Sequence, residues 1–418
     1  MTKATAAAVL AVGLAAGGAR GDEISAALAK YDKPVAASID RALAYLARRQ
    51  GADGSIHANP SSATAVTSLS VMAFLAKGHT PGAGPYGRVI DRAVDYVLAS
   101  QQPNGLLVGQ RQTRGPMYSH GISTLMLSEI SGMVDPSRQA RVDAALSKAL
   151  RLILAAQQVR KSSMHRGGWR YQHTSTDSDI SCSGWSIMSL RSARNSGAAV
   201  PTEAVREAIG FIRRCRVGGG GFAYQPGGPA GLARTGTALL CLELCGHHAD
   251  KEAVAAGEYV LATIGVSRTN AKVWEARAEQ QNQQFARVVA AAKQRADEAK
   301  RSGQPASTVR RLAEKHTQLA QRYGELAKRR AVLARQRAVR MRFGGSHFYY
   351  GLYYCSQGMF QLGGRYWEQF GAFLYETMLK FQQPDGSWPR RSVCTCYSTA
   401  MGVLAMSVSY RQLPIYQR

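Results

Sequence analysis

Two stretches of the chain, Ile39 to Gln50 (IDRALAYLARRQ) and Ile90 to Gln101 (IDRAVDYVLASQ), share one frame of residues. In both, apolar residues recur at spacings of three and four, as an amphipathic α-helix requires. The frame returns less perfectly in four further segments, at residues 145–157, 205–215, 254–264 and 370–382. The two frames begin 51 residues apart, at Ile39 and Ile90. An internal repeat of roughly 50 residues is typical of folds built from stacked units. The sequence therefore predicts six copies of one helical unit.

A glycine, often followed by an aromatic residue, comes after most of these helices. The clearest case runs from Gln382 to Gly386 and Trp388, and glycine commonly ends a helix. A second helix, rich in Ala, Gly, Ser and Met and poor in charge, is predicted in every unit, over residues 63–76, 119–130, 180–192, 232–245, 348–362 and 397–408. Because these helices carry few charges, we expect them to be buried more completely than the first helices.

Six pairs of one half-buried and one buried helix predict an all-α fold, an α/α toroid with an inner and an outer ring. The toroid is expected to contain residues 22–266 and 343–418. An open superhelix of stacked helical pairs is the structural alternative.

The composition is that of a globular protein with an unusual charge. The 418 residues are 45% hydrophobic, and 53 Lys and Arg face 27 Asp and Glu, for a formal net charge of +26. These values exclude a disordered, collagen-like or small disulfide-stapled chain. The seven cysteines are odd in number and scattered, which argues against a disulfide framework.

The N-terminus has the pattern of a cleaved signal peptide. Lys3 precedes an apolar run from Ala4 to Ala16, and small residues lead to Gly21. We predict a signal peptide at residues 1–21 and export to the periplasm or another extracytoplasmic site. A disordered or helical N-terminus of a cytoplasmic protein is the alternative. No apolar run is long enough for a transmembrane helix.

A polar, charged insertion at residues 267–342 separates the two helices of the fifth unit. Leu312, Leu319, Leu326 and Leu333 are seven residues apart, and a helix-breaking stretch at residues 301–305 lies upstream of them. This pattern predicts an antiparallel coiled-coil hairpin that projects from the ring.

The hairpin supplies half of the net charge, because it carries 19 Lys and Arg against 6 Asp and Glu. A charged hairpin surface can be simply solvated. It can also attract a polyanion, for which anionic lipid or an acidic polymer is preferred. Nucleic acid is not expected as a partner, since the hairpin lacks a series of aromatic residues for stacking on bases.

The repeat resembles that of squalene-hopene cyclases and protein prenyltransferase β subunits, which share the α/α toroid. The resemblance is carried by an outer helix that ends in glutamine and is followed by Gly-x-Trp, as from Phe373 to Gln382 and Trp388. The third unit, from Gly167 to Trp185, and the ending from Leu413 to Arg418 are also similar to a group of exported bacterial prenyltransferase/squalene-oxidase-repeat proteins. For that group the resemblance implies a fold rather than an activity.

Asp177 and Asp179 are the predicted catalytic residues. The resemblance implies that Asp179 matches the middle acid of the cyclase Asp-x-Asp-Asp motif, which protonates the substrate, and that Asp177 matches the first acid. The third acidic position is Ile180 here, so the carboxylate that would complete the motif is missing. Alternatively, either aspartate caps the inner helix.

The predicted ligand-binding residues stand near the starts of the inner helices, which meet at one mouth of a toroid. Helix N-termini favour anions there, while aromatic residues suit a polyene, a sugar polymer or plain core packing. The predicted set is His120, Tyr171, Trp185, Arg234, His347, Tyr349, Tyr350 and Tyr397.

No cofactor and no metal are predicted. In prenyltransferases zinc is bound by an Asp-x-Cys pair and a later histidine. Here only Asp179 is in place, because Cys182 stands one position late and Cys394 replaces the histidine. Glycosidase or lyase chemistry would need paired carboxylates across an open cleft.

Two functions follow as hypotheses. The first is an exported protein of the terpenoid-cyclase and prenyltransferase kind that binds or modifies an isoprenoid or other hydrophobic ligand in a central cavity. The second is a non-catalytic binding or scaffold module that contacts an envelope polymer, anionic lipid or a protein partner through its basic hairpin.

Overall fold

The computed structural model describes residues 26–57, 62–109, 115–248, 250–343, 347–389 and 393–417. The expected signal peptide at residues 1–21 lies outside the described residues and stays a prediction. Among the described residues, none of the helices combines the length and the apolar character that crossing a bilayer requires.

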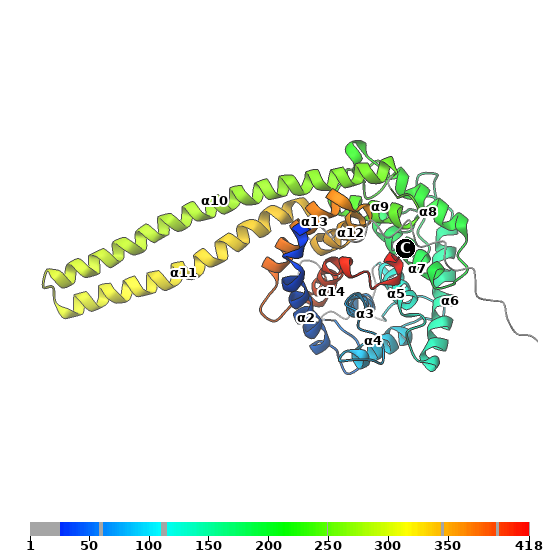
Figure 1. The fold of residues 1–418 in the computed structure, drawn as a ribbon, viewed down its shortest axis with the longest axis horizontal. Helices are drawn as coiled ribbons and strands as arrows, with labels where there is room; N and C mark the ends of the chain where they lie inside the picture. Colours follow the sequence, from blue (N-terminus) through cyan, green and yellow to red (C-terminus); the bar gives the residue numbers. More distant parts are fainter. Residues whose placement is uncertain are drawn as a thin grey trace, which may run out of the picture.

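Six buried helices form an inner ring (Figure 1). They are α3 (Ala63–Ala76), α5 (Pro116–Ile130), α7 (Ile180–Asn195), α9 (Leu232–Leu244), α12 (Phe348–Leu362) and α14 (Thr395–Met406). Each helix contacts the next in this order, and α14 contacts α3. The ring is therefore closed, which confirms the predicted toroid over an open superhelix, where α3 and α14 would lie at opposite ends.

Six amphipathic helices lie outside this ring. They are α2 (Asp32–Arg48), α4 (Gly87–Ala99), α6 (Pro136–Gln158), α8 (Thr202–Arg214), the first part of α10 (Lys251–Arg301) and α13 (Gly364–Phe381), against which the short α1 (Ala26–Ala29) packs. In α8, Ala204, Ala208 and Ile212 are buried while Glu203 and Arg206 are exposed. The helical period of the sequence thus selects the face that covers the inner ring.

Glycines in the inner helices allow neighbouring helices to approach closely. A Cβ atom on Gly184 of α7 would lie 2.4 Å from Cγ2 of Thr237 on α9. A Cβ atom on Gly236 of α9 would lie 2.5 Å from Sγ of Cys355 on α12. No side chain fits at these distances. The small residues of the inner helices therefore allow neighbouring helices of the ring to pack this closely.

A glutamine that ends four of the six outer helices joins its unit to the next. Nε2 of Gln50 donates to the carbonyl oxygen of Gly54 at 3.0 Å and to that of Val89, on the next outer helix, at 2.8 Å. The same pair of bonds runs from Gln101 to Gly105 and Ala145, from Gln157 to Gly167 and Ala204, and from Gln382 to Gly386 and Ser38. The last pair connects the sixth unit to the first, so one interaction both links neighbours and closes the ring.

The glycine after each glutamine packs against the backbone of the next outer helix. Gly386 has a φ of 90°, and a Cβ atom there would lie 2.3 Å from the carbonyl oxygen of Arg41 on α2. Gly54 has a φ of 89° and approaches the carbonyl oxygen of Arg92 in the same way. Only glycine meets both the left-handed backbone and the close approach.

The insertion is a pair of long antiparallel helices that projects from the ring (Figure 1). Its first arm is continuous with the fifth outer helix, because α10 runs without a break through 51 residues. It packs along α11 (Ala306–Phe343). The rings of Phe285 and Tyr323 stack between the arms with centroids 4.7 Å apart. Leu333, the last of the four heptad leucines, is 59% exposed, so the apolar seam does not reach it.

Candidate functional site

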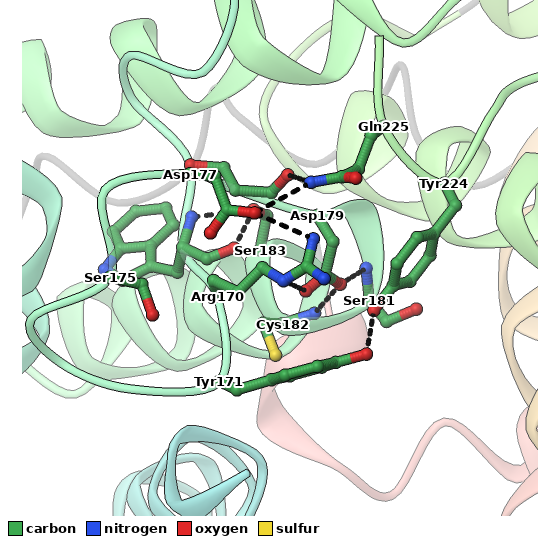
Figure 2. A network of polar contacts seen from close by, with 12 residues as sticks. Arg170, Tyr171, Ser175, Asp177, Asp179, Ser181, Cys182, Ser183, Tyr224 and Gln225 are labelled. Carbon is green, nitrogen blue, oxygen red and sulfur yellow. Dashed lines mark hydrogen bonds and ion pairs between the residues drawn. The ribbon is translucent and has the colours of Figure 1, made fainter. Parts of the chain in front are cut away.

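Asp177 and Asp179 lie on the loop that leads into α7 (Figure 2). Trp169 anchors the start of this loop: its indole N–H donates to the Ile153 carbonyl at 2.8 Å, and its backbone N–H donates to Oγ of Ser183 at 2.9 Å. The backbone N–H of Asp179 donates to the Trp169 carbonyl at 2.8 Å. These bonds fold the loop back on itself and set both aspartates beside the N-terminus of α7.

Asp179 is fully buried and uses its two oxygens differently. Oδ1 accepts hydrogen bonds from the backbone N–H groups of Ser181 at 2.8 Å and Cys182 at 3.0 Å. Oδ2 is buried, accepts no hydrogen bond and lies 3.9 Å from Nε of Arg170. Burial raises the pKa of Asp179 to about 6, although the two N–H groups and Arg170 oppose the shift. The capping role left open by the sequence is therefore present, and it leaves Oδ2 available.

Arg170 is the cation next to this acid. Its guanidinium carbon lies 4.6 Å from the ring centre of Tyr171 and 5.6 Å from that of Tyr224. Nη1 of Arg170 lies 3.2 Å from Oδ2 of Asp177. Stacking on two rings and pairing with a carboxylate hold the guanidinium at the loop surface, above the buried Asp179.

Asp177 has a different environment from Asp179. Its side chain is 45% exposed and accepts a hydrogen bond from Nε2 of Gln225 at 3.2 Å. The same amide of Gln225 donates to the Ser178 carbonyl at 3.0 Å. Asp177 is thus an exposed carboxylate held by Arg170 and Gln225, whereas Asp179 is a buried acid. Two carboxyl groups in such different environments can take different chemical roles.

Four tyrosines surround the acid. The hydroxyls of Tyr171 and Tyr224 are 2.6 Å apart, and the rings of Tyr118 and Tyr171 have centroids 5.8 Å apart. The Tyr350 hydroxyl lies 2.8 Å from Oγ1 of Thr237. Burial, reinforced by the charge of Asp179, raises the pKa of both Tyr118 and Tyr350. These tyrosines therefore remain neutral and present apolar faces and hydroxyls around the carboxyl group.

Trp185 lies deeper in the ring, on the second turn of α7. Its ring stacks on Tyr353 with centroids 5.7 Å apart and meets the edge of Tyr354 at 5.3 Å. All three side chains are almost wholly buried. Trp185 is therefore part of an aromatic layer, formed with Tyr353 and Tyr354, that fills the middle of the ring.

His120 occupies a structural position of the repeat. Its Nδ1 accepts the backbone N–H of Leu107 at 3.1 Å, and its Nε2 lies 3.2 Å from the Ala149 carbonyl. Side-chain oxygens accept the matching N–H in four other units, at Thr67, Ser183, Thr235 and Thr399. Burial lowers the pKa of His120 to about 4, so the ring is neutral and donates from Nε2. Both nitrogens are thus engaged, and neither is offered to a ligand.

Two of the other predicted residues lie beside Tyr350. The exposed ring of His347 has its centroid 6.5 Å from that of Tyr350. Partial burial and the positive charge of Arg234 lower the pKa of His347. Arg234 also donates from Nη1 to the Pro229 carbonyl at 2.7 Å. These two basic side chains therefore form a neighbouring part of the same mouth.

The last two predicted residues belong to the fifth and sixth inner helices. Tyr397 is half-buried and contributes to raising the pKa of Tyr350, which places the two hydroxyls near each other. Tyr349 is buried and packs edge-on against Phe348, with centroids 4.9 Å apart. The structure thus gathers Asp177, Asp179, Tyr171 and Tyr350 into one cluster, with Tyr397 next to Tyr350.

The alternative zinc ligands occupy separate structural positions. Cys182 follows Asp179 on α7, whereas Sγ of Cys394 accepts the backbone N–H of Tyr397 at the start of α14. Within the part of the chain that the structure describes, no group of three His, Cys, Asp or Glu side chains is placed to hold a metal ion.

Sequence reasoning missed Arg170, Tyr224 and Gln225 as members of the site. A signal for Tyr224 was present, because it stands four residues after Gly220 as Tyr171 stands four residues after Gly167. Aligning the loops of units three and four would have paired the two tyrosines. Their contact still depends on how the ring curves, which the alignment does not contain.

Comparison with known proteins gives no family for this chain. No protein-family model matches it, and no curated protein is similar to it. Among solved structures it is similar to the type II terpene cyclase MstE from Scytonema in its apo form, with 16% identity over 55% of this chain and 78% of that chain and a TM-score of 0.31. A variant of that enzyme in complex with geranylgeranyl dihydroxybenzoate gives 16% identity over 54% and 76% of the two chains, again with a TM-score of 0.31. Similarity at this level transfers no function, so we derive the function from this chain's own residues.

Proposed function

We propose that the chain binds an isoprenoid-like ligand, apolar except for a hydrogen-bond donor such as a hydroxyl, at the mouth of the ring and that Asp179 accepts that hydrogen bond. The observation that carries this proposal is Oδ2 of Asp179, a fully buried carboxyl oxygen whose nearest cation, Nε of Arg170, lies 3.9 Å away, beyond hydrogen-bond distance. A buried acceptor without a hydrogen bond is costly. A ligand that donates a hydrogen bond to Oδ2 removes that cost.

The surroundings of Asp179 suit such a ligand. Arg170 stacks on Tyr171 and Tyr224, while the ring of Tyr171 that remains exposed and the partly buried ring of Tyr118 offer apolar contact. The raised pKa of about 6 makes this carboxyl a weaker acid than an ordinary aspartate, which suits hydrogen bonding to a ligand better than protonation of an alkene. Asp177 is the supporting residue, because it holds the guanidinium of Arg170 above Asp179.

The aromatic layer limits how far the ligand enters. Trp185 stands on the helix that Asp179 caps, and it stacks on Tyr353 rather than facing an open channel. The third acid of the cyclase motif is replaced by Ile180, which is buried. Binding at the mouth is therefore favoured over cyclisation of a long polyene inside the ring.

The proposal is tested by extracting the purified protein with organic solvent and analysing the extract by mass spectrometry. The wild type should yield a largely apolar compound, and Asp179→Asn, which keeps the cap but replaces the accepting Oδ2 by an NH2 donor, should yield at least several-fold less. The matched control is Asp135→Asn, at the exposed aspartate that caps α6 through the Arg138 N–H. Equal amounts of compound from all three proteins would reject the proposed role of Asp179.

The second candidate function is attachment to an anionic surface through the hairpin. Every Lys and Arg between residues 272 and 329 is exposed. At the base of the hairpin, Arg268 pairs with Glu376 at 3.8 Å and Glu275 with Lys380 at 3.4 Å, so two ion pairs tie the first arm to α13. The positive charge is thus presented away from the ring, where it attracts anionic lipid or an acidic polymer.

Sedimentation with vesicles tests this second function. Binding to vesicles with anionic lipid should weaken between about 50 and 300 mM salt, as the Debye length falls from roughly 14 to 6 Å. The control variant lacks residues 280–328, with Glu279 joined to Arg329 by a short Gly-Ser link. These positions face each other if the Phe285–Tyr323 pairing continues toward the base. Vesicle binding that is unchanged in this variant would exclude the hairpin, and binding only to a soluble acidic polymer would exclude lipid.

A further inference from the structure

The last described segment of the chain, residues 408–417, closes the end of the ring opposite Asp179. It follows α14 and contains two short 3₁₀ turns, Val408–Tyr410 and Pro414–Tyr416. The second turn contacts α7, and the C-terminus lies beside α7 in Figure 1. Leu413, Ile415 and Tyr416 are buried.

Polar groups of the inner helices hold this segment in place. The backbone N–H of Ile415 donates to Oε2 of Glu129 near the end of α5, at 3.2 Å, and Oε1 of the same carboxyl group accepts a short bond from Ser192 of α7. The hydroxyls of Tyr416 and Tyr353 are 2.7 Å apart. The segment is thus bound as a peptide ligand would be, through a backbone N–H, a phenol and apolar side chains.

The ring is complete without this segment. The glutamine and glycine contacts that close the ring involve Gln382, Gly386 and α2, and the last inner helix ends at Met406. Gln417 donates to the carbonyls of Arg411 and Gln412 within the segment itself. Arg411 and Gln412, which precede the buried part, are exposed. The segment is therefore joined to the ring by an accessible link.

The surface under the segment is an aromatic floor with one buried acid. Tyr353 and Tyr354 form the floor together with Trp185, and Glu129 stands at its edge. The groups that face Glu129 are the Ser192 hydroxyl on α7, the Ile415 N–H, Tyr353 on α12 and Tyr416. The aromatic layer separates this end from the Asp179 mouth, so the two sites are distinct.

We infer that residues 412–417, the part of this segment after the exposed Arg411, are a displaceable plug and that the surface beneath them is a second binding site. Its ligand is an extended apolar molecule that donates a hydrogen bond to Glu129 and places a hydroxyl against Tyr353. This inference does not depend on the proposed role of Asp179.

The test uses full-length protein with a protease site inserted after Arg411. After cleavage of the folded protein, gel filtration and mass spectrometry report whether the released peptide stays bound. The ring should keep its helical circular dichroism, lose the peptide and bind the apolar dye anilinonaphthalene sulfonate. A synthetic peptide of residues 412–418 should then displace the dye. A ring that unfolds on cleavage, or that releases the peptide only on unfolding, would show that the segment is core and overturn the inference.

Variants of the floor sharpen the test. In the cleaved protein, Tyr353→Phe should weaken rebinding of the peptide roughly five- to tenfold, since one buried hydrogen bond is lost. Glu243→Gln on α9, where a buried glutamate bonds His248 instead, is the matched control and should leave rebinding unchanged. Equal rebinding by wild type and Tyr353→Phe would contradict the assigned contacts.

The acidity of Glu129 supplies an independent readout. Burial raises the pKa of Glu129 to about 7, with Ser192 and the Ile415 N–H opposing. When the peptide covers the site, the protonated form of the Glu129 carboxyl is favoured. The affinity of the peptide should therefore fall as pH rises from about 5 to 7 and stay constant above pH 7. Glu129→Gln should remove this pH dependence, and an identical profile in the variant would count against the site.

Discussion

At the scale of single residues, Asp179 shows how one side chain serves both fold and chemistry. One oxygen completes the N-terminus of α7, where the first N–H groups lack helical partners. The other is buried, 3.9 Å from Nε of Arg170, and the charge of Asp179 acts on Tyr118, Tyr224 and Tyr350. The cap fixes the rotamer, so the second oxygen is held in place without a hydrogen bond of its own.

Asp179→Asn is expected to change the pH dependence of stability. The folded-state pKa of about 6 lies above the ordinary 3.8, so the wild type binds this proton more tightly when folded. Relative to the Asn variant, its free energy of unfolding should be highest below about pH 4 and fall by up to roughly 3 kcal/mol between pH 4 and 6. Above pH 6 the difference should be constant.

Urea unfolding over pH 4–8 measures this difference. Asp135→Asn is the control, because hydrogen bonds from Ser137 and the Arg138 N–H lower the pKa of Asp135, so its contribution to stability changes only below about pH 4 and stays flat over this range. If the free energies of unfolding of the wild type and Asp179→Asn differed by a constant amount over the whole pH range, Asp179 would not be a buried acid.

At the scale of elements, α10 unites an outer helix of the ring with an arm of the hairpin. The sequence placed a boundary near residue 267, after Gly265, yet Gly265 lies inside the helix. A Cβ atom there would meet nothing within 4 Å, and a single glycine costs a helix only about 1 kcal/mol. Ser267 is fully buried, so contact with the ring continues past the expected boundary.

Deleting the hairpin is expected to leave a folded ring. The variant that lacks residues 280–328 keeps the contacts of Arg268 and Glu275 with α13 and should unfold cooperatively, with a midpoint close to that of the wild type. Deleting residues 267–342 and inserting a short Gly-containing loop should cost more, because it removes the buried Ser267. The ion pairs at the base are partly exposed and contribute little.

Circular dichroism and thermal unfolding of both deletion variants measure their helical content and unfolding midpoints. A molten shorter variant would mean that the ring needs the arms in order to fold.

At the scale of the whole molecule, contacts between the sixth and the first unit close the ring. They are the same glutamine and glycine contacts that join the first unit to the second. Gly386→Ala is expected to destabilise the protein much more than Gly227→Ala. Both glycines have positive φ, at 90° and 81°, but a Cβ atom on Gly227 meets nothing within 4 Å. Gly227→Ala should cost roughly 1–2 kcal/mol for the backbone. Gly386→Ala should cost roughly 1–3 kcal/mol more, for overlap with Arg41 of the first unit.

Chemical unfolding of the two variants measures the difference. Equal costs would mean that the sixth unit does not pack on the first in solution.

The sequence by itself determined the helices, their pairing and the cap at Asp179. The period of the apolar residues predicts a helix, a glycine predicts its end, and an aspartate before an apolar helix predicts a cap. Each of these signals spans only a few residues, so the local sequence is enough to detect it. The count of six units also predicted a closed ring, because six helical pairs in a ring leave no end to cap.

Only the tertiary structure decided what lies inside the ring. Arg170 between Tyr171 and Tyr224 joins units three and four, and Trp185 on Tyr353 joins units three and five. Such contacts depend on the curvature of the ring, which arises from many close helix approaches and not from any one segment. For the same reason, the sequence listed His120 as a ligand-binding residue although its neighbours engage both nitrogens. It also gave no sign that Tyr416 would reach Tyr353, because that contact spans 63 residues.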